Sequence, residues 1–168
     1  MKLTSAAGKP GSVRKAPLGT VAVRVTASLP RTRAMAVAQA ALDEAWDYAA
    51  ERQAFGKPLA AFQGVSHPLA DLQTQVLAAR LLCLQALWLK DHDLPHSAEA
   101  AMCKWWAPKL AYDVVHQCLL THGHGGYDRG VMEQRLRDVL GFQIGDGTAQ
   151  IMKTIIARAQ AGRAAVGV

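Results

Sequence analysis

Acidic residues are missing from the first quarter of this chain, and their absence divides the sequence into two regions. The chain has 168 residues and a formal net charge of +6, yet its first acidic residue is Asp43. Residues 1–42 hold seven of the 19 Lys and Arg, which leaves twelve basic against thirteen acidic residues in the remainder. The excess positive charge therefore belongs to the N-terminal region, and the nearly neutral remainder does not suggest a nucleic-acid partner.

Cysteines are few, and long apolar runs are absent. The three cysteines, Cys83, Cys103 and Cys118, share no CxxC spacing and are odd in number, which argues against a disulfide framework and favours a reducing cytoplasm. The most apolar run, residues 81–89, is far too short to cross a bilayer, so we expect no membrane partner.

A metal site is not expected either. Two of the histidines, His122 and His124, are separated by one residue and lie near His116, but no Cys or carboxylate cluster accompanies them. Zinc and related metals are usually held by sets of such ligands at regular spacing. Solvated loop histidines therefore explain this pattern better than a metal centre.

Residues 1–30 have the composition of a disordered leader. They are rich in Gly, Pro, Ser and Thr and carry charge of one sign, although alternation over residues 20–26 hints at a short strand. An organelle transit peptide would share the basic, acid-free composition, but no amphipathic helical pattern supports it. We favour a disordered or non-native start, joined to a domain whose upstream partner was lost or is encoded separately.

Residues 31–168 predict one all-α domain. A chain of this length can bury one sizeable core, and no strand alternation follows Pro30. Apolar residues recur every three or four positions, which predicts helices over residues 31–54, 62–90, 97–122, 131–140 and 148–161. Long helices with short connections predict an antiparallel four-helix bundle.

Single residues predict where some of these helices begin, bend or end. Pro108 lies in the middle of the third helix and should kink it, whereas Ser97 suits the start of that helix. The glycine-rich residues 122–127 predict a loop after it. Thr148 is placed to cap the last helix.

The corner at residues 52–59 has residue types that suit a phosphate-bearing ligand. Arg52 offers a planar fork of donors, and Phe55 offers a flat apolar face. Gly56 permits backbone conformations that other residues resist, and Pro58 stops the preceding helix. On these residues alone, an ordinary helix–turn–helix corner with a solvated arginine remains the alternative.

This corner belongs to a longer series of motifs in a fixed order. The series comprises residues 48–52, 55–59, 62–63, 69–71, 78–80, 104, 137–138 and 145–148. It resembles the C-terminal helical domain of the acyl-CoA dehydrogenases, flavoenzymes that desaturate acyl thioesters. The resemblance runs from about residue 34 to about residue 163.

The resemblance implies a catalytic base at Asp146. In the family, an acidic residue before a Gly-Thr pair, usually a glutamate, removes the α-proton of the acyl-CoA while the β-hydride goes to the flavin of FAD. Asp146 stands at that position, between Gly145 and Gly147 and two residues before Thr148. Taken without the resemblance, an Asp between two glycines is better explained as a turn-forming residue with no catalytic role.

The resemblance also implies the FAD contacts. Arg52, Phe55 and Gln63 match family positions that grip the FAD of a neighbouring subunit, and Thr148 matches a threonine that hydrogen-bonds the flavin. The partners implied are an acyl-CoA substrate and either a homo-oligomer or a fuller dehydrogenase subunit. At one position the chain departs from the family, since Leu120 stands where a glutamine usually faces FAD.

Two functions remain open at this point. One is the C-terminal part of a flavin-dependent acyl-CoA dehydrogenase, an oxidoreductase of CH–CH bonds with little activity expected for the chain alone. The other is a non-catalytic dimerisation or assembly module, a truncated remnant of such an enzyme. The family's β-domain, which covers one face of the flavin, has no counterpart in this sequence, and this favours the second function for an isolated chain.

Overall fold

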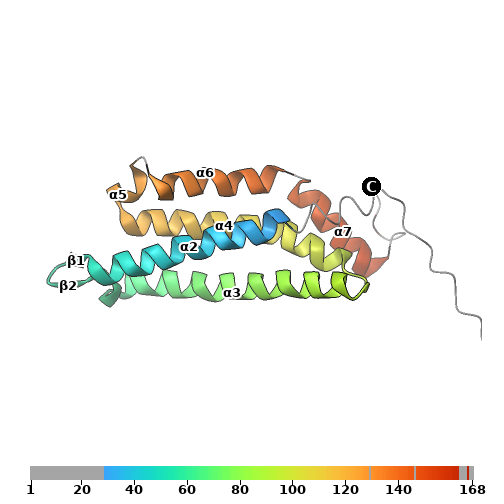
Figure 1. Cartoon of the computed structure of the whole chain (residues 1–168), viewed down its shortest axis with the longest axis horizontal. Helices are drawn as coiled ribbons and strands as arrows, with labels where there is room; N and C mark the ends of the chain where they lie inside the picture. The colour runs from blue at the N-terminus through green and yellow to red at the C-terminus, as the bar shows by residue number, and fades with distance from the viewer. Residues whose placement is uncertain (1–28, 129, 146, 163–165, 167–168) are drawn as a thin grey trace, which may run out of the picture.

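The computed structural model describes residues 29–128, 130–145, 147–162 and 166, with side chains described from residue 33. The leader predicted for residues 1–30 lies almost entirely outside these residues. The long helices are α2 (Leu29–Glu51), α3 (Gln63–Asp91), α4 (Ser97–His122) and α6 (Val131–Ile144). Successive long helices run antiparallel, α2 and α4 lie against each other in parallel, and α7 (Ala149–Ala161) packs on α4 at one end (Figure 1). The predicted all-α antiparallel bundle is confirmed.

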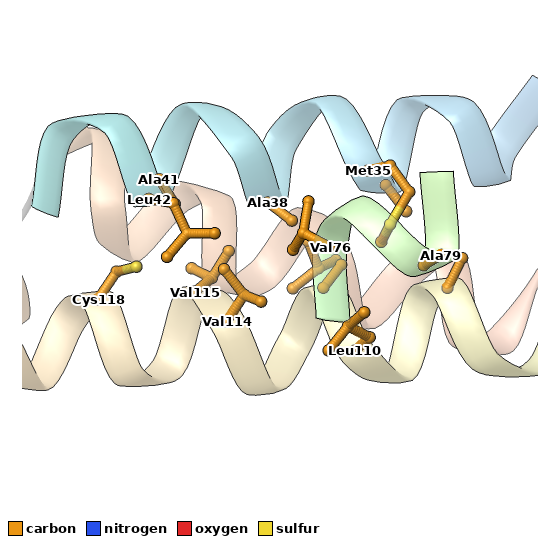
Figure 2. Packing of buried hydrophobic residues seen from close by; sticks show 14 of the residues in the cluster. Met35, Ala38, Ala41, Leu42, Val76, Ala79, Leu110, Val114, Val115 and Cys118 are labelled. Atoms are coloured by element: carbon orange, nitrogen blue, oxygen red, sulfur yellow. The ribbon is translucent and has the colours of Figure 1, made fainter. Parts of the chain in front are cut away.

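Helix α4 is the central element of the bundle, because it lies against α2, α3, α6 and α7. Figure 2 shows Leu110, Val114 and Val115 of α4 pointing towards Leu42 of α2 and Val76 of α3. All five side chains are at most 2% exposed. Burying a side chain of this kind stabilises the fold by about 1.5–3 kcal/mol, so this layer is the main source of cohesion among the helices.

The buried face of α2 consists largely of small residues. Every three or four positions it presents an alanine that is fully buried, namely Ala34, Ala38, Ala41, Ala45 and Ala49. Small side chains let two helix backbones approach closely, with large side chains of the neighbouring helix filling the gaps. The sequence pattern of α2 therefore explains how it packs against α4.

The corner after α2 is a β-hairpin rather than a plain turn. Strand β1 (Gln53–Ala54) pairs antiparallel with β2 (Lys57–Pro58), and a 3-10 turn η1 (Leu59–Ala61) leads into α3. Phe55 and Gly56 have φ values of 51° and 80°, and both central residues of a tight type I′ hairpin need positive φ. The expectation of no strand after Pro30 was wrong, because strands of two residues are too short to show alternation.

The glycine-rich residues after α4 form a short helix, α5 (His124–Tyr127), where a loop was expected. Gly126 is buried there, and a Cβ added to it would lie 2.5 Å from the carbonyl oxygen of Leu119. Glycine at this position thus allows close packing against the end of α4. Helix α6 also continues beyond the expected end at Leu140, as far as Ile144.

Two expectations about α4 have mixed outcomes. The helix begins at Ser97, as predicted, but no side chain caps it. It continues as one helix through Pro108, which is buried inside the bundle, and the kink expected there stays a prediction. At α7 the expected cap is present, since Thr148 accepts a long hydrogen bond of 3.5 Å from the Ile151 amide.

Among the described residues, α3 is long and apolar enough to cross a membrane when judged by length and composition alone. Core helices of soluble proteins pass the same test, so this is weak evidence. One face of α3 lies in the core through Leu69, Val76 and Ala79. The rest of its apolar character comes from an exposed stripe of large residues on another face.

Candidate functional site

The predicted FAD contacts Arg52, Phe55 and Gln63 gather at the hairpin end of the bundle (Figure 1). Their backbone is held in place: the Arg52 amide donates to the Tyr48 carbonyl at 2.8 Å, and the Arg52 carbonyl accepts from the Leu59 amide at 2.9 Å. All three side chains are exposed. A fixed backbone that carries open side chains suits a ligand that approaches from outside this chain.

Phe55 is the most exposed aromatic residue in the described part of the chain, with 97% of its surface accessible. Its ring meets the edge of Phe62 with centroids 6.2 Å apart, and the Lys57 ammonium lies 4.2 Å from the Phe62 centroid. This end therefore presents an aromatic face beside two cationic side chains, Arg52 and Lys57. Such a combination can hold an aromatic ring that carries phosphates.

The other predicted contact, Thr148, lies at the α6–α7 junction at the opposite end (Figure 1). It opens α7, so the helix N-terminus adds partial positive charge beside it. Asp146, the predicted base, lies outside the described residues, but both of its neighbours are described. Gly147 has a φ of 105°, a conformation that favours glycine.

One charged residue at this end was not assigned a role from sequence. Lys104 of α4 is only 3% exposed, and its ammonium donates to the carbonyl oxygens of Phe142 and Gly145, the former at 3.0 Å. The sequence signal was present, since Lys104 is a lysine within an otherwise apolar helix face and belongs to the family motif series. Nothing in helical periodicity shows what such a lysine contacts.

Beside Lys104, a small cavity of 180 Å³ opens between α4, α6 and α7. It is lined by Lys104, Trp105, Lys109, Gln143, Ala149 and Lys153. The Lys153 ammonium lies 4.6 Å from the centroid of the Trp105 ring, so α7 is fastened to α4 at this point. The adjacent Trp106 packs against the core instead.

A single chain does not bring the two groups of site residues together. Along α4, Lys104 and His122 are separated by roughly 27 Å of helix. The His122 ring stacks on Tyr48 with centroids 4.5 Å apart, and Tyr48 lies one turn before Arg52. The hairpin contacts and Thr148 are therefore at opposite ends of the bundle.

Two further groups have altered acidity. Arg135 donates two hydrogen bonds to Glu44, of 2.6 and 2.7 Å, and this pairing lowers the pKa of the Glu44 carboxyl below 4.5. Burial raises the pKa of the Cys118 thiol to about 12. The Glu44–Arg135 pair joins α2 to α6. Cys118 is a buried thiol with little reactivity, because the thiolate is the reactive form.

Metal ligands do not cluster in the described residues, where no group of three or more His, Cys, Asp or Glu side chains is close enough to share an ion. His122 instead lies against Tyr48, with its Nδ1 atom 2.7 Å from the Cys118 carbonyl oxygen.

The bundle, its corner hairpin and the capped α6–α7 junction define a helical domain of the flavoenzyme type that the sequence motifs suggested. Residues 25–161 match the family model described as the acyl-CoA dehydrogenase C-terminal domain. The chain belongs to this family.

Individual relatives agree with this assignment. The probable acyl-CoA dehydrogenase YngJ of Bacillus subtilis is 42% identical over 127 residues, covering 74% of this chain and 33% of the relative. Butyryl-CoA dehydrogenase from Megasphaera elsdenii superposes with a TM-score of 0.81 at 30% identity, over 84% of this chain and 37% of that protein. PigA, solved as its FAD complex, gives a TM-score of 0.72 at 29% identity, over 75% and 33% of the two chains. The chain spans about a third of the length of these relatives.

Proposed function

We propose that this chain supplies the C-terminal part of a flavin-dependent acyl-CoA dehydrogenase. Asp146 takes the α-proton of the acyl thioester, and FAD, when bound, accepts the β-hydride. Arg52, Phe55, Gln63 and Thr148 hold the cofactor. The single observation that carries the proposal is the placement of these described residues at the two open ends of a bundle of this family.

The described residues fit FAD by their chemistry. At the hairpin, Arg52 is suited to the pyrophosphate and the exposed ring of Phe55 to the adenine. At the other end, the Thr148 hydroxyl and the N-terminus of α7 suit the polar edge of a flavin. The relative PigA, which was solved with FAD, supports the same cofactor for this chain.

A second copy of the chain, or a fuller dehydrogenase subunit, completes the site. The two groups of FAD contacts are too far apart for one cofactor to reach both within a single bundle, so they serve different sites of an assembly. An exposed stripe on α3 suits self-association: Leu77, Leu81, Leu84 and Trp88 are between 52% and 57% exposed. Their spacing of four, three and four residues is that of a coiled-coil seam.

Substitution of the base tests the proposed reaction. Within an assembly that contains the family's β-domain, Asp146→Asn removes the proton acceptor and should lower turnover by at least about 100-fold, the usual contribution of a general base. FAD binding should be unchanged, which separates a loss of chemistry from a loss of cofactor. Undiminished turnover would remove Asp146 from the role of base.

The chain alone should show little or no dehydrogenase activity. When these 168 residues are assayed apart from the family's β-domain, water should reach the flavin and part of the substrate pocket should be missing. An assay of acyl-CoA oxidation by the lone chain, run beside a flavin titration followed by absorbance, checks this expectation, because turnover like that of the full assembly would contradict it. The buried thiols also agree with a reducing cytoplasm as the site of action.

A non-catalytic assembly module is the second candidate, and the α3 stripe is the observation that favours it. Such a module would self-associate but would neither bind FAD nor support turnover with a fuller subunit. The flavin titration of the assembly distinguishes the two functions.

A further inference from the structure

Lys104 is the one buried charged residue among the side chains that the structure describes, and the site as proposed gives it no role. It lies on α4, about two turns after Ser97, with 3% of its surface exposed. Burying an ammonium costs free energy that only hydrogen bonds and opposite charge recover. Its presence in the core therefore calls for a specific interaction.

That interaction is with the C-terminal end of α6. The last four carbonyls of a helix lack partners within the helix, and Phe142 lies among the last residues of α6. The Lys104 ammonium donates to the Phe142 carbonyl at 3.0 Å and to the Gly145 carbonyl just after the helix. It also places positive charge at the negative end of the α6 dipole. Lys104 thus satisfies carbonyl groups at the C-terminal end of α6.

The segment that follows depends on this restraint. Gly145 and Gly147 flank Asp146 in the sequence, and glycines leave a backbone free to move. On the far side of the turn, α7 contacts α4 through the Lys153 ammonium, which lies over the Trp105 ring. Two adjacent residues of α4, Lys104 and Trp105, therefore contact the chain before and after Asp146.

We propose that Lys104 is a positioning residue for Asp146, acting through the Phe142 and Gly145 carbonyls rather than on substrate or flavin. The inference rests on the proposed role of Asp146 as the base. A base has to be held within hydrogen-bond reach of the proton that it removes, and a displacement of about 1 Å can cost about 100-fold in rate. A turn with two glycines meets that demand only when its ends are fixed from outside.

Hydrogen–deuterium exchange of the full chain tests whether Lys104 holds the turn. Lys104→Met keeps the length of the side chain and removes its donors, so peptides covering residues 142–152 should exchange at least about tenfold faster. Peptides from α2 should be unchanged. Lys104→Arg keeps the charge and the donors and should restore most of the protection.

Lys109→Met is the matched control, because Lys109 lies on the same helix and lines the same cavity but is exposed and paired with Asp113 at 2.7 Å. It should exchange like the unaltered chain. If circular dichroism shows that Lys104→Met does not fold, Lys104→Gln, which retains a shorter donor, takes its place and should show a smaller increase. Unchanged exchange over residues 142–152 in a folded variant that lacks the ammonium would overturn the inference.

Steady-state kinetics of the flavin-loaded assembly provide a second measurement. A purely structural role of Lys104 would not lower kcat selectively. Lys104→Met should lower kcat at least about tenfold while the KM for acyl-CoA changes by less than about threefold. An equal loss in KM, or wild-type kcat, would contradict the positioning role. A failure of the proposed function gives a different result. In that case Asp146→Asn keeps full turnover, while Lys104→Met still speeds exchange over residues 142–152.

Discussion

At the scale of single residues, the ion pair between Glu44 and Arg135 predicts a pH-dependent part of the stability. The Arg135 hydrogen bonds lower the pKa of the Glu44 carboxyl below 4.5, so the folded state binds this proton less tightly than the unfolded chain does. The stabilisation is therefore present above about pH 4.5 and is lost as the pH falls through the lowered pKa.

Because the Glu44 side chain is 48% exposed, solvent weakens the pair. Glu44→Gln should cost about 0.5–1 kcal/mol in the free energy of unfolding at pH 7, measured by urea denaturation, and the cost should disappear near pH 3. Asp113→Asn, which breaks an exposed pair with Lys109 within one helix, should cost less. A cost for Glu44→Gln that stays constant down to pH 3 would contradict this account.

Some residues of the candidate site can be predicted from the sequence, and others cannot. Arg52, Phe55 and Gln63 are proposed as FAD contacts from the motif, because such a prediction needs only residue type and order. Their common end of the bundle follows from the helix order alone. The buried contact of Lys104 with α6 joins residues 38 and 41 positions apart, and neither periodicity nor motif spacing shows such a contact.

At the scale of elements, the β1–β2 hairpin stores backbone strain at Phe55. Its φ of 51° lies in the left-handed region, which costs a non-glycine residue about 1–2 kcal/mol, whereas Asn tolerates it better. Phe55→Asn should therefore stabilise the chain by up to about 1 kcal/mol in chemical denaturation. The same change should weaken FAD binding by the assembly, because the exposed aromatic face is lost.

Gly56→Ala, at the next position of the same turn, should lower the stability instead of raising it. A Cβ at Gly56 meets nothing within 4 Å, so its effect is conformational, and a φ of 80° should make it destabilising by about 1 kcal/mol. If Phe55→Asn destabilised the chain as much as Gly56→Ala does, strain at this turn would not be the explanation.

The long helices are the elements that sequence predicts best, and the corner is predicted least well. Helix α3 was expected over residues 62–90 and spans Gln63–Asp91, because an apolar face repeated over many turns is a strong signal. A pair of two-residue strands gives no such repeat, and its turn depends on positive φ at Phe55, a residue type that rarely adopts it.

At the scale of the whole molecule, the exposed stripe on α3 predicts self-association. The double change Leu81→Glu and Leu84→Glu places two charges in the stripe and should shift the chain to monomer at concentrations where the unaltered chain is oligomeric. Sedimentation velocity over a range of concentrations measures this. Gln75→Glu, exposed on another side of α3, should leave the assembly intact.

The central claim is that each flavin site takes its two groups of contacts from different chains, and mixing two variants in an assembly that contains the β-domain tests it most directly. Arg52→Ala damages the hairpin contact and Asp146→Asn removes the base, so each variant alone should be inactive. In a two-fold assembly, random mixing should recover roughly a quarter of wild-type turnover, since half of the pairs are mixed and each mixed pair holds one intact site. No recovery, with mixed pairs demonstrated by mass spectrometry, would contradict the account.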